Sequence, residues 1–143
     1  MGSTVELFQW DGRRGLLAQQ QSVSTLPVNY RGVSTAAEIR VSIDGRFLYA
    51  SNRGHNGITV FAISQQSGRL KPIQYVPTGG RTPRNFDFDP TEQWLLVTNQ
   101  DSQNAQVFRV DRMIGKLTVA GQPVAYPVRS LLDSWVLDRR ITD

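Results

Sequence analysis

A repeat of 47 residues constrains the fold of this chain more than any other feature of its sequence. SGRL at 67–70 is matched by IGKL at 114–117, and FLYASN at 47–52 is matched by WLLVTN at 94–99, with the same offset in both cases. LFQWDGRRGLL at 7–17 resembles the second half of the same unit. A fixed period in the forties indicates a fold assembled from repeated supersecondary units. The chain therefore consists of half a repeat, two full repeats and a tail.

Each full repeat is expected to form four short antiparallel strands. The first repeat has β-branched and aromatic segments at 38–43, 46–52, 58–63 and 70–77, separated by turn residues such as Asp44-Gly45. The second repeat has the same arrangement. Four strands in a unit of this period are typical of a β-propeller blade, whereas a β-sandwich does not require a fixed repeat. We therefore predict an all-β, partial β-propeller, with half a blade followed by two four-stranded antiparallel blades.

The C-terminal tail departs from the repeat. Residues 1–128 are predicted to form the propeller part, and residues 129–143 a divergent tail. Ser130 is a candidate N-cap for a short amphipathic helix. The apolar face of that helix would consist of Leu131, Leu132, Trp135 and Val136. Two alternatives remain open, namely an inner strand of a third blade formed by PVRSLL, or a frayed end.

The composition excludes several classes of function. The 143 residues include no cysteine and one histidine, which excludes disulfides, thiolate zinc sites and thiol nucleophiles. No phosphate-binding loop or metal-ligand spacing occurs, so neither a cofactor nor a metal is expected. The net charge is +4, but the 14 arginines are scattered from Arg13 to Arg140, and nucleic-acid surfaces concentrate their cations. Nucleic-acid binding is therefore not expected. Without a membrane-length apolar run or a signal-type N-terminus, the simplest expectation is a cytoplasmic location with no membrane contact.

Strand order brings several polar residues to one face of the predicted propeller. In an antiparallel blade, the first strand begins and the second strand ends at the same face. Glu38 is expected at the start of a first strand, and Arg53 and His55 follow the end of the second. By the repeat offset, Glu38 corresponds to Asn85, which is preceded by Arg84. These side chains are therefore expected near the mouth of the central channel.

The residue types on this face fit hydrolysis of an anionic ester or lactone. A carboxylate such as that of Glu38 can act as a general base toward water. The guanidinium groups of Arg53 and Arg84 suit a carboxylate, a phosphate or a developing oxyanion, and these three residues are the candidate catalytic groups. Gly79-Gly80 either frees backbone N–H groups for an anion or forms the turn between blades. The candidate substrate-binding residues are the other polar side chains at this face: His55, Asn52, Asn85 and Asn99.

Each candidate also has a structural interpretation. Glu38 can form an ordinary ion pair with Arg40 or Arg53 at the surface. His55 can be a turn residue in the glycine-flanked loop RGHNG. The two asparagines that end the second strands can cap turns by bonding nearby backbone.

Three segments together resemble the lactonase family of seven-bladed β-propellers: AAEIRVSIDGRFLYASNRGH at 36–55, VPTGGRTPRNFDFDP at 76–90 and WLLVTNQDS at 94–102. The resemblance runs from about Val5 to about Val124 and covers roughly the C-terminal third of a family member. It implies lactone hydrolysis, as in 6-phosphogluconolactonase, and a sugar-phosphate or lactone ligand. In the family, the AEI glutamate, the SNRG arginine with its following histidine and the TPRNF arginine surround the channel mouth. These correspond to Glu38, Arg53, His55 and Arg84.

The resemblance also shows what this sequence does not include. The family site draws on a histidine and an arginine from earlier blades, which lie outside this sequence. A blade normally buries both faces against neighbours, so two and a half blades expose two lateral apolar walls. We therefore expect self-association, as a homodimer or a higher oligomer, and reduced or absent activity of the isolated chain. The alternative function is a non-catalytic oligomeric scaffold, or a module that binds a small anion or sugar phosphate.

Overall fold

The computed structural model describes residues 2–126, and every regular element in that range is a β-strand. No helix in this range could cross a membrane. The strands form three antiparallel sheets. The first sheet is a hairpin of β1 (Thr4–Asp11) and β2 (Leu16–Ser24). The second contains β3 (Thr35–Val41), β4 (Phe47–Arg53), β5 (Gly57–Ile63) and β6 (Leu70–Pro77). The third contains β7 (Pro83–Phe88), β8 (Trp94–Asn99), β9 (Asn104–Val110) and β10 (Leu117–Ala125).

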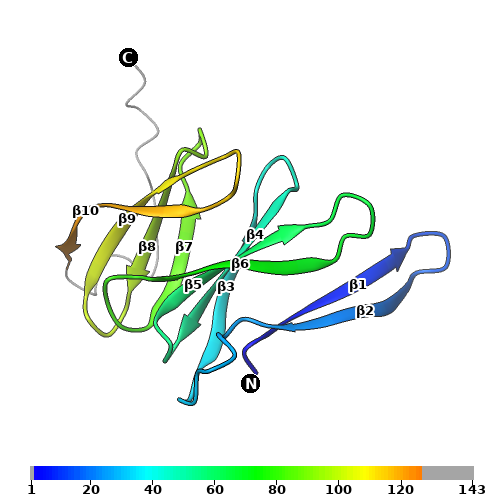
Figure 1. Ribbon diagram of the computed structural model, residues 1–143, viewed down its shortest axis with the longest axis horizontal. Helices are drawn as coiled ribbons and strands as arrows, with labels where there is room; N and C mark the ends of the chain where they lie inside the picture. The colour runs from blue at the N-terminus through cyan, green and yellow to red at the C-terminus, as the bar shows by residue number, and fades with distance from the viewer. Residues whose placement is uncertain (1, 127–143) are drawn as a thin grey trace.

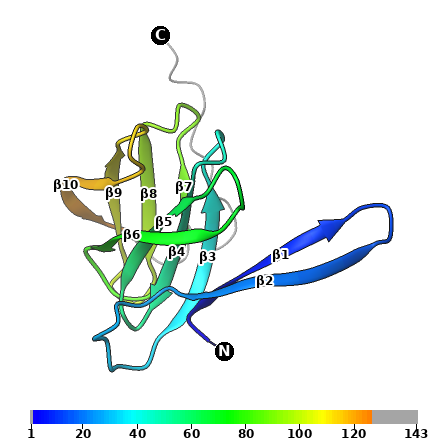
Figure 2. The same cartoon turned by 45° about the vertical axis from the view of Figure 1, so that its right-hand side comes forward.

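This architecture confirms the predicted half-blade and two four-stranded blades. The two four-stranded sheets lie side by side with β3 next to β7, and the β1–β2 hairpin extends away from them (Figures 1 and 2). The largest difference from the predicted boundaries is at β3, which begins at Thr35 rather than at Glu38. The helix and strand predictions for the tail at 129–143 lie outside the described residues.

The same tight turn closes the outer hairpin of all three units. In each turn, a glycine N–H donates to the carbonyl oxygen four residues earlier. The pairs are Gly15 with Asp11 at 2.8 Å, Gly68 with Ser64 at 2.8 Å and Gly115 with Asp111 at 2.7 Å. The three glycines have φ values of 65°, 71° and 78°, which glycine adopts without steric strain. The repeated glycine in SGRL and IGKL is therefore explained by turn geometry.

Apolar side chains fill the two spaces between consecutive units. The core between the two blades includes Phe47, Tyr49, Val60, Phe86, Leu95 and Phe108. A second core, between the hairpin and the first blade, contains Val5, Leu48, Ala50, Phe61 and Leu70. Burying one large apolar side chain contributes about 1.5–3 kcal/mol. Packing between units, rather than within a single sheet, therefore holds the blades in place.

A glutamine on β2 and a glutamine on β6 each join one unit to the next. The Gln21 Nε2 donates to the Leu70 carbonyl oxygen at 2.9 Å, and its Oε1 accepts from the Leu70 N–H at 2.8 Å. Gln74 makes the same two bonds with Leu117, both at 2.8 Å. Each glutamine thus satisfies both backbone groups of the first residue in the next outer strand. The same contact between units occurs twice in this chain.

Candidate functional site

Glu38 lies in the middle of β3, with its carboxylate held by its own strand. The β3–β4 register shifts between Ala36 and Ile39, and the Glu38 N–H donates to Ser51 Oγ at 3.1 Å. Glu38 Oε1 accepts from the Ile39 N–H at 3.1 Å and from Arg40 Nη1 at 2.5 Å. Among the described residues, no hydrogen bond engages Oε2. One carboxylate oxygen is therefore fixed, and the other is available to a ligand or water.

Arg40 links Glu38 to the neighbouring blade. Its Nη1 pairs with Glu38, and its Nε lies 3.4 Å from Asp87 Oδ1 on β7. The ion pair with Arg40, one of the two structural interpretations of Glu38, is therefore present. Arg40 and Asp87 occupy the same position in successive repeats. The repeat offset could have revealed this link, because opposite charges at equivalent positions of adjacent inner strands can meet.

Arg53 ends β4 opposite Thr35, at the face where β3 begins. Its Nη2 donates to the Ala36 carbonyl oxygen at 3.5 Å. Its Nε is buried and has no hydrogen-bond partner in the described part of the chain. No ion pair joins Arg53 to Glu38 within residues 2–126. Leaving a buried donor without a partner costs free energy. In Arg53 this donor belongs to a charged group that lies beside the Glu38 strand.

His55 is held at the same face by a contact that the sequence did not suggest. Its N–H donates to Ser34 Oγ at 3.3 Å, and its ring meets Tyr30 edge-on with centroids 5.0 Å apart. Nδ1 is buried without a partner in residues 2–126. Burial lowers the pKa of His55, so its neutral form is favoured. His55 is therefore suited to hydrogen bonding rather than to supplying charge.

The length of the linker that carries Tyr30 is the sequence feature that could have indicated this contact. Ten residues separate β2 from β3, whereas five separate β6 from β7. The extra residues bring Tyr30 against His55. The longer linker was readable in the sequence, but its packing partner was not.

Arg84 and Asn85 lie exposed on β7, the inner strand next to β3. Arg84 Nη1 lies 3.4 Å from Gln100 Oε1, at the end of β8. Within residues 2–126, no hydrogen bond or ion pair connects either side chain to Glu38. The structure thus places both residues at the predicted face but not in contact with the carboxylate. Roles of Glu38, Arg53, His55, Arg84 and Asn85 in catalysis or substrate binding stay predictions.

Asn52 and Asn99 are fully buried and join consecutive units. Asn52 Nδ2 donates to the Thr25 carbonyl oxygen at 2.9 Å, and its Oδ1 accepts from Thr25 Oγ1 at 2.6 Å. Asn99 Nδ2 donates to the Thr78 carbonyl oxygen at 2.9 Å. Each threonine directly follows the outer strand of the preceding unit. These asparagines therefore bond distant backbone rather than a nearby turn, and their burial keeps both side chains away from the surface.

Gly79 and Gly80 form a packed turn between the blades. A Cβ atom on Gly80 would lie 2.3 Å from both Ser102 Oγ and Asn104 Oδ1, and 2.6 Å from Asn99 Nδ2. The Gly79 carbonyl oxygen accepts from Asn104 Nδ2 at 2.9 Å. Polar side chains therefore occupy the space beside Gly80. The turn interpretation of this pair fits the structure better than the anion-binding one.

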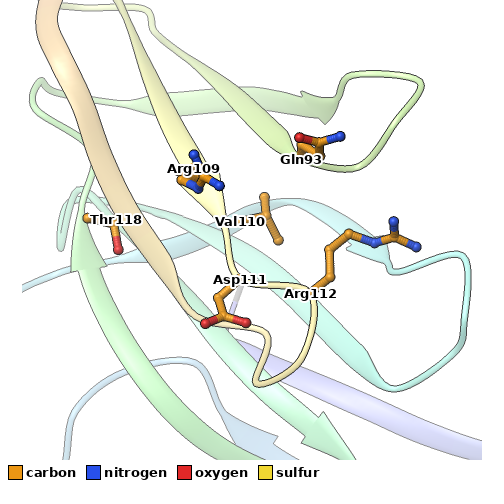
Figure 3. A pocket seen from close by; sticks show the side chains of 6 residues that line it. All are labelled: Gln93, Arg109, Val110, Asp111, Arg112 and Thr118. Atoms are coloured by element: carbon orange, nitrogen blue, oxygen red, sulfur yellow. The ribbon is translucent and has the colours of Figure 1, made fainter.

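An open hollow of about 470 Å³ lies on the opposite face, at the turn that joins β9 to β10 (Figure 3). It is lined by Gln93, Arg109, Val110, Asp111, Arg112 and Thr118. The Arg109 guanidinium stacks 5.7 Å from the Trp94 ring centre, and Asp111 Oδ1 accepts from the Met113 N–H at 2.9 Å. None of the predicted site residues lines this hollow. Residues 2–126 contain no group of three or more His, Asp or Glu side chains that could hold a metal ion.

Comparison with known proteins identifies one family. A family described as "Lactonase, 7-bladed beta-propeller" matches residues 1–133. The 6-phosphogluconolactonase of Bacillus subtilis is 36% identical over 127 residues, which are 89% of this chain and 36% of that protein. The 6-phosphogluconolactonase of Formosa agariphila is 46% identical over 109 residues, which are 75% of this chain and 30% of that protein.

Solved structures agree with this comparison. A protein from Lactobacillus plantarum superimposes with a TM-score of 0.82 at 40% identity, over 87% of this chain and 36% of that one. The periplasmic gluconolactonase of Pseudomonas aeruginosa superimposes with a TM-score of 0.80 at 34% identity, over 86% of this chain and 34% of that one. The chain thus spans about a third of the length of the relatives it matches.

Proposed function

Since the chain belongs to the family of seven-bladed β-propeller lactonases, we propose that it takes part in the hydrolysis of a lactone, with Glu38 as the general base. The observation that supports this role is the Glu38 carboxylate on an inner strand, which is fixed through Oε1 and whose Oε2 has no hydrogen bond within residues 2–126. The names of the relatives, 6-phosphogluconolactonase and gluconolactonase, favour a sugar lactone, which carries a phosphate group in the first case.

In the proposed reaction, Glu38 Oε2 accepts a proton from water as the water oxygen bonds to the lactone carbonyl carbon. The ring C–O bond then breaks, and the leaving oxygen takes the proton from Glu38. The products are a carboxylic acid and a hydroxyl group, and Glu38 returns to its ionised form. Arg40 and the Ile39 N–H keep Oε1 in place throughout.

Arg53 and Arg84 are proposed to bind the negative charges of the reacting substrate. Both guanidinium groups are permanently charged and present several donors in a fixed plane. Arg53 is partly exposed beside the Glu38 strand, so its guanidinium group can bind the oxyanion that forms on the carbonyl oxygen. Arg84 on β7 is proposed to bind the substrate phosphate. The neutral His55 and the exposed Asn85 would supply further hydrogen bonds.

The test is hydrolysis of 6-phosphogluconolactone by the chain and by Glu38→Gln. We expect the substitution to reduce kcat/KM by about 10²- to 10⁴-fold, the usual contribution of a general base. Glu92→Gln is the matched control, because Glu92 lies on the opposite face and accepts the Ile43 N–H at 2.9 Å. Equal rates for the wild type and Glu38→Gln would remove Glu38 from the mechanism.

A non-catalytic function is the second candidate, and the length of the chain favours it. The chain spans about a third of its relatives, and the family site also uses residues from earlier blades. Calorimetric binding of 6-phosphogluconate without turnover of the lactone would support a sugar-phosphate-binding module.

A cytoplasmic location also stays a prediction, which cell fractionation can test.

A further inference from the structure

The β1–β2 hairpin exposes apolar side chains at positions that are buried in the full blades. The turn and the strand register relate Phe8 to Phe61 and Leu17 to Leu70. Phe8 is 46% exposed and Leu17 is 62% exposed, whereas Phe61 and Leu70 are buried. Both buried counterparts face the preceding unit, where they pack with Val5. The hairpin therefore exposes the apolar surface that, in each full blade, packs against the preceding unit.

The second blade exposes the other half of that contact. The β9–β10 register gives Val124 the ladder position that Val76 has in β5–β6. Val76 is buried in the core between the blades, but Val124 is 67% exposed. Trp94, one repeat after the buried Phe47, is also exposed. The wall that the first blade buries against its neighbour is thus uncovered in the second blade, within the described residues.

A glutamine also lies near the exposed valine of the second blade. Gln122 precedes Val124 by two residues, as Gln21 precedes Val23 and Gln74 precedes Val76, but it lies in the β10 bulge, and Ala120 has the ladder position of Gln74. The first two glutamines bond both backbone groups of the leucine that begins the next outer strand. Gln122 is exposed and makes no such bond in residues 2–126. Leu17 is the hairpin counterpart of those two leucines.

We propose that the chain self-associates head to tail, with the exposed wall of its second blade seated on the β1–β2 hairpin of a second copy. Val124 of one copy packs against Phe8 and Leu17 of the next, and Gln122 lies close to that contact. A second copy is the fitting occupant because its hairpin carries the residues that complete a contact already made twice inside this chain. The two surfaces differ, so the contact is heterologous and can continue from copy to copy.

The absence of cysteine from the sequence makes cross-linking a clean test. Two single-cysteine variants, Leu17→Cys and Gln122→Cys, are mixed after one has been isotopically labelled, and are treated with a short bis-maleimide. We expect a heterodimer in the mixture, identified by mass spectrometry, and little dimer from either variant alone. No heterodimer in the mixture, or an equal yield of dimer from one variant alone, would overturn the head-to-tail contact.

A charge on the exposed wall tests the apolar part of the contact. Val124→Asp, added to the Gln122→Cys variant, is expected to weaken association at least about tenfold, because an unpaired carboxylate would be buried. Val28→Asp is the matched control, since Val28 is an exposed valine in the β2–β3 linker. Sedimentation velocity measures association, and far-UV circular dichroism checks the fold of each variant. An equal effect of both substitutions, or a monomeric wild type, counts against the proposal.

Discussion

Replacing Asn52 with alanine is expected to lower the free energy of unfolding by about 2–3 kcal/mol. The substitution removes two buried hydrogen bonds to Thr25, at 2.9 and 2.6 Å, and each is worth about 1–1.5 kcal/mol. Thr25 keeps partners, because its carbonyl oxygen still accepts from Thr59 Oγ1 at 2.6 Å, and its one hydroxyl hydrogen, which Asn52 Oδ1 and the Ser3 carbonyl oxygen share, then donates to Ser3 alone at 2.9 Å. No new unsatisfied group on Thr25 therefore adds to the loss.

Urea denaturation followed by tryptophan fluorescence measures this change. Asn85→Ala is the matched control, because Asn85 is exposed and its loss should change stability by no more than about 0.5 kcal/mol. A double-mutant cycle of Asn52→Ala with Thr25→Ala should give a coupling energy of about 1 kcal/mol or more. Equal unfolding midpoints for Asn52→Ala and Asn85→Ala would refute the role of Asn52 in joining the hairpin to the first blade.

Two further predictions concern the same face of the molecule. Gly80→Ala places a Cβ atom within 2.6 Å of three polar side chains and should cost about 1–3 kcal/mol by overpacking, as measured by thermal unfolding; an unchanged midpoint would contradict this packing. Burial lowers the pKa of His55 below 6.5, so its contribution to stability is complete above pH 6.5 and is lost as the pH falls toward the folded-state pKa. In His55→Gln this part of the pH dependence should disappear from urea midpoints between pH 5 and 7; identical pH profiles would show that His55 does not titrate as its burial implies.

The repeat made the blades predictable because every unit uses the same glycine turn and strands of similar length. SGRL and IGKL mark a glycine turn that requires positive φ, so this signal is local and does not depend on tertiary packing. The start of β3 was predicted three residues late, because the register shift between Ala36 and Ile39 depends on pairing with β4. No glycine or proline within β3 marks that shift.

The placement of the candidate site was predictable only in part. Strand order predicted Glu38, Arg53 and His55 at one face; Arg53 and His55 lie at the end of β4 opposite Thr35, whereas Glu38 lies in the middle of β3. The partners of Asn52 and Asn99 lie 27 and 21 residues away along the chain, so their burial follows from packing between units, which local turn chemistry does not encode. Arg40 and Asp87, like Gln21 and Gln74, occupy repeated positions in the sequence. The contacts that these side chains make depend on how the blades pack, which the repeat alone does not predict.

The central claim is that a lactone site lies on the face where β3 and β7 begin. The most direct test is a chemical-shift titration of isotopically labelled chain with 6-phosphogluconate. The largest amide shifts should fall on Ile39, Arg53 and Arg84, around the free oxygen of Glu38. Shifts confined to Arg109 and Arg112, at the hollow on the opposite face, would contradict the claim.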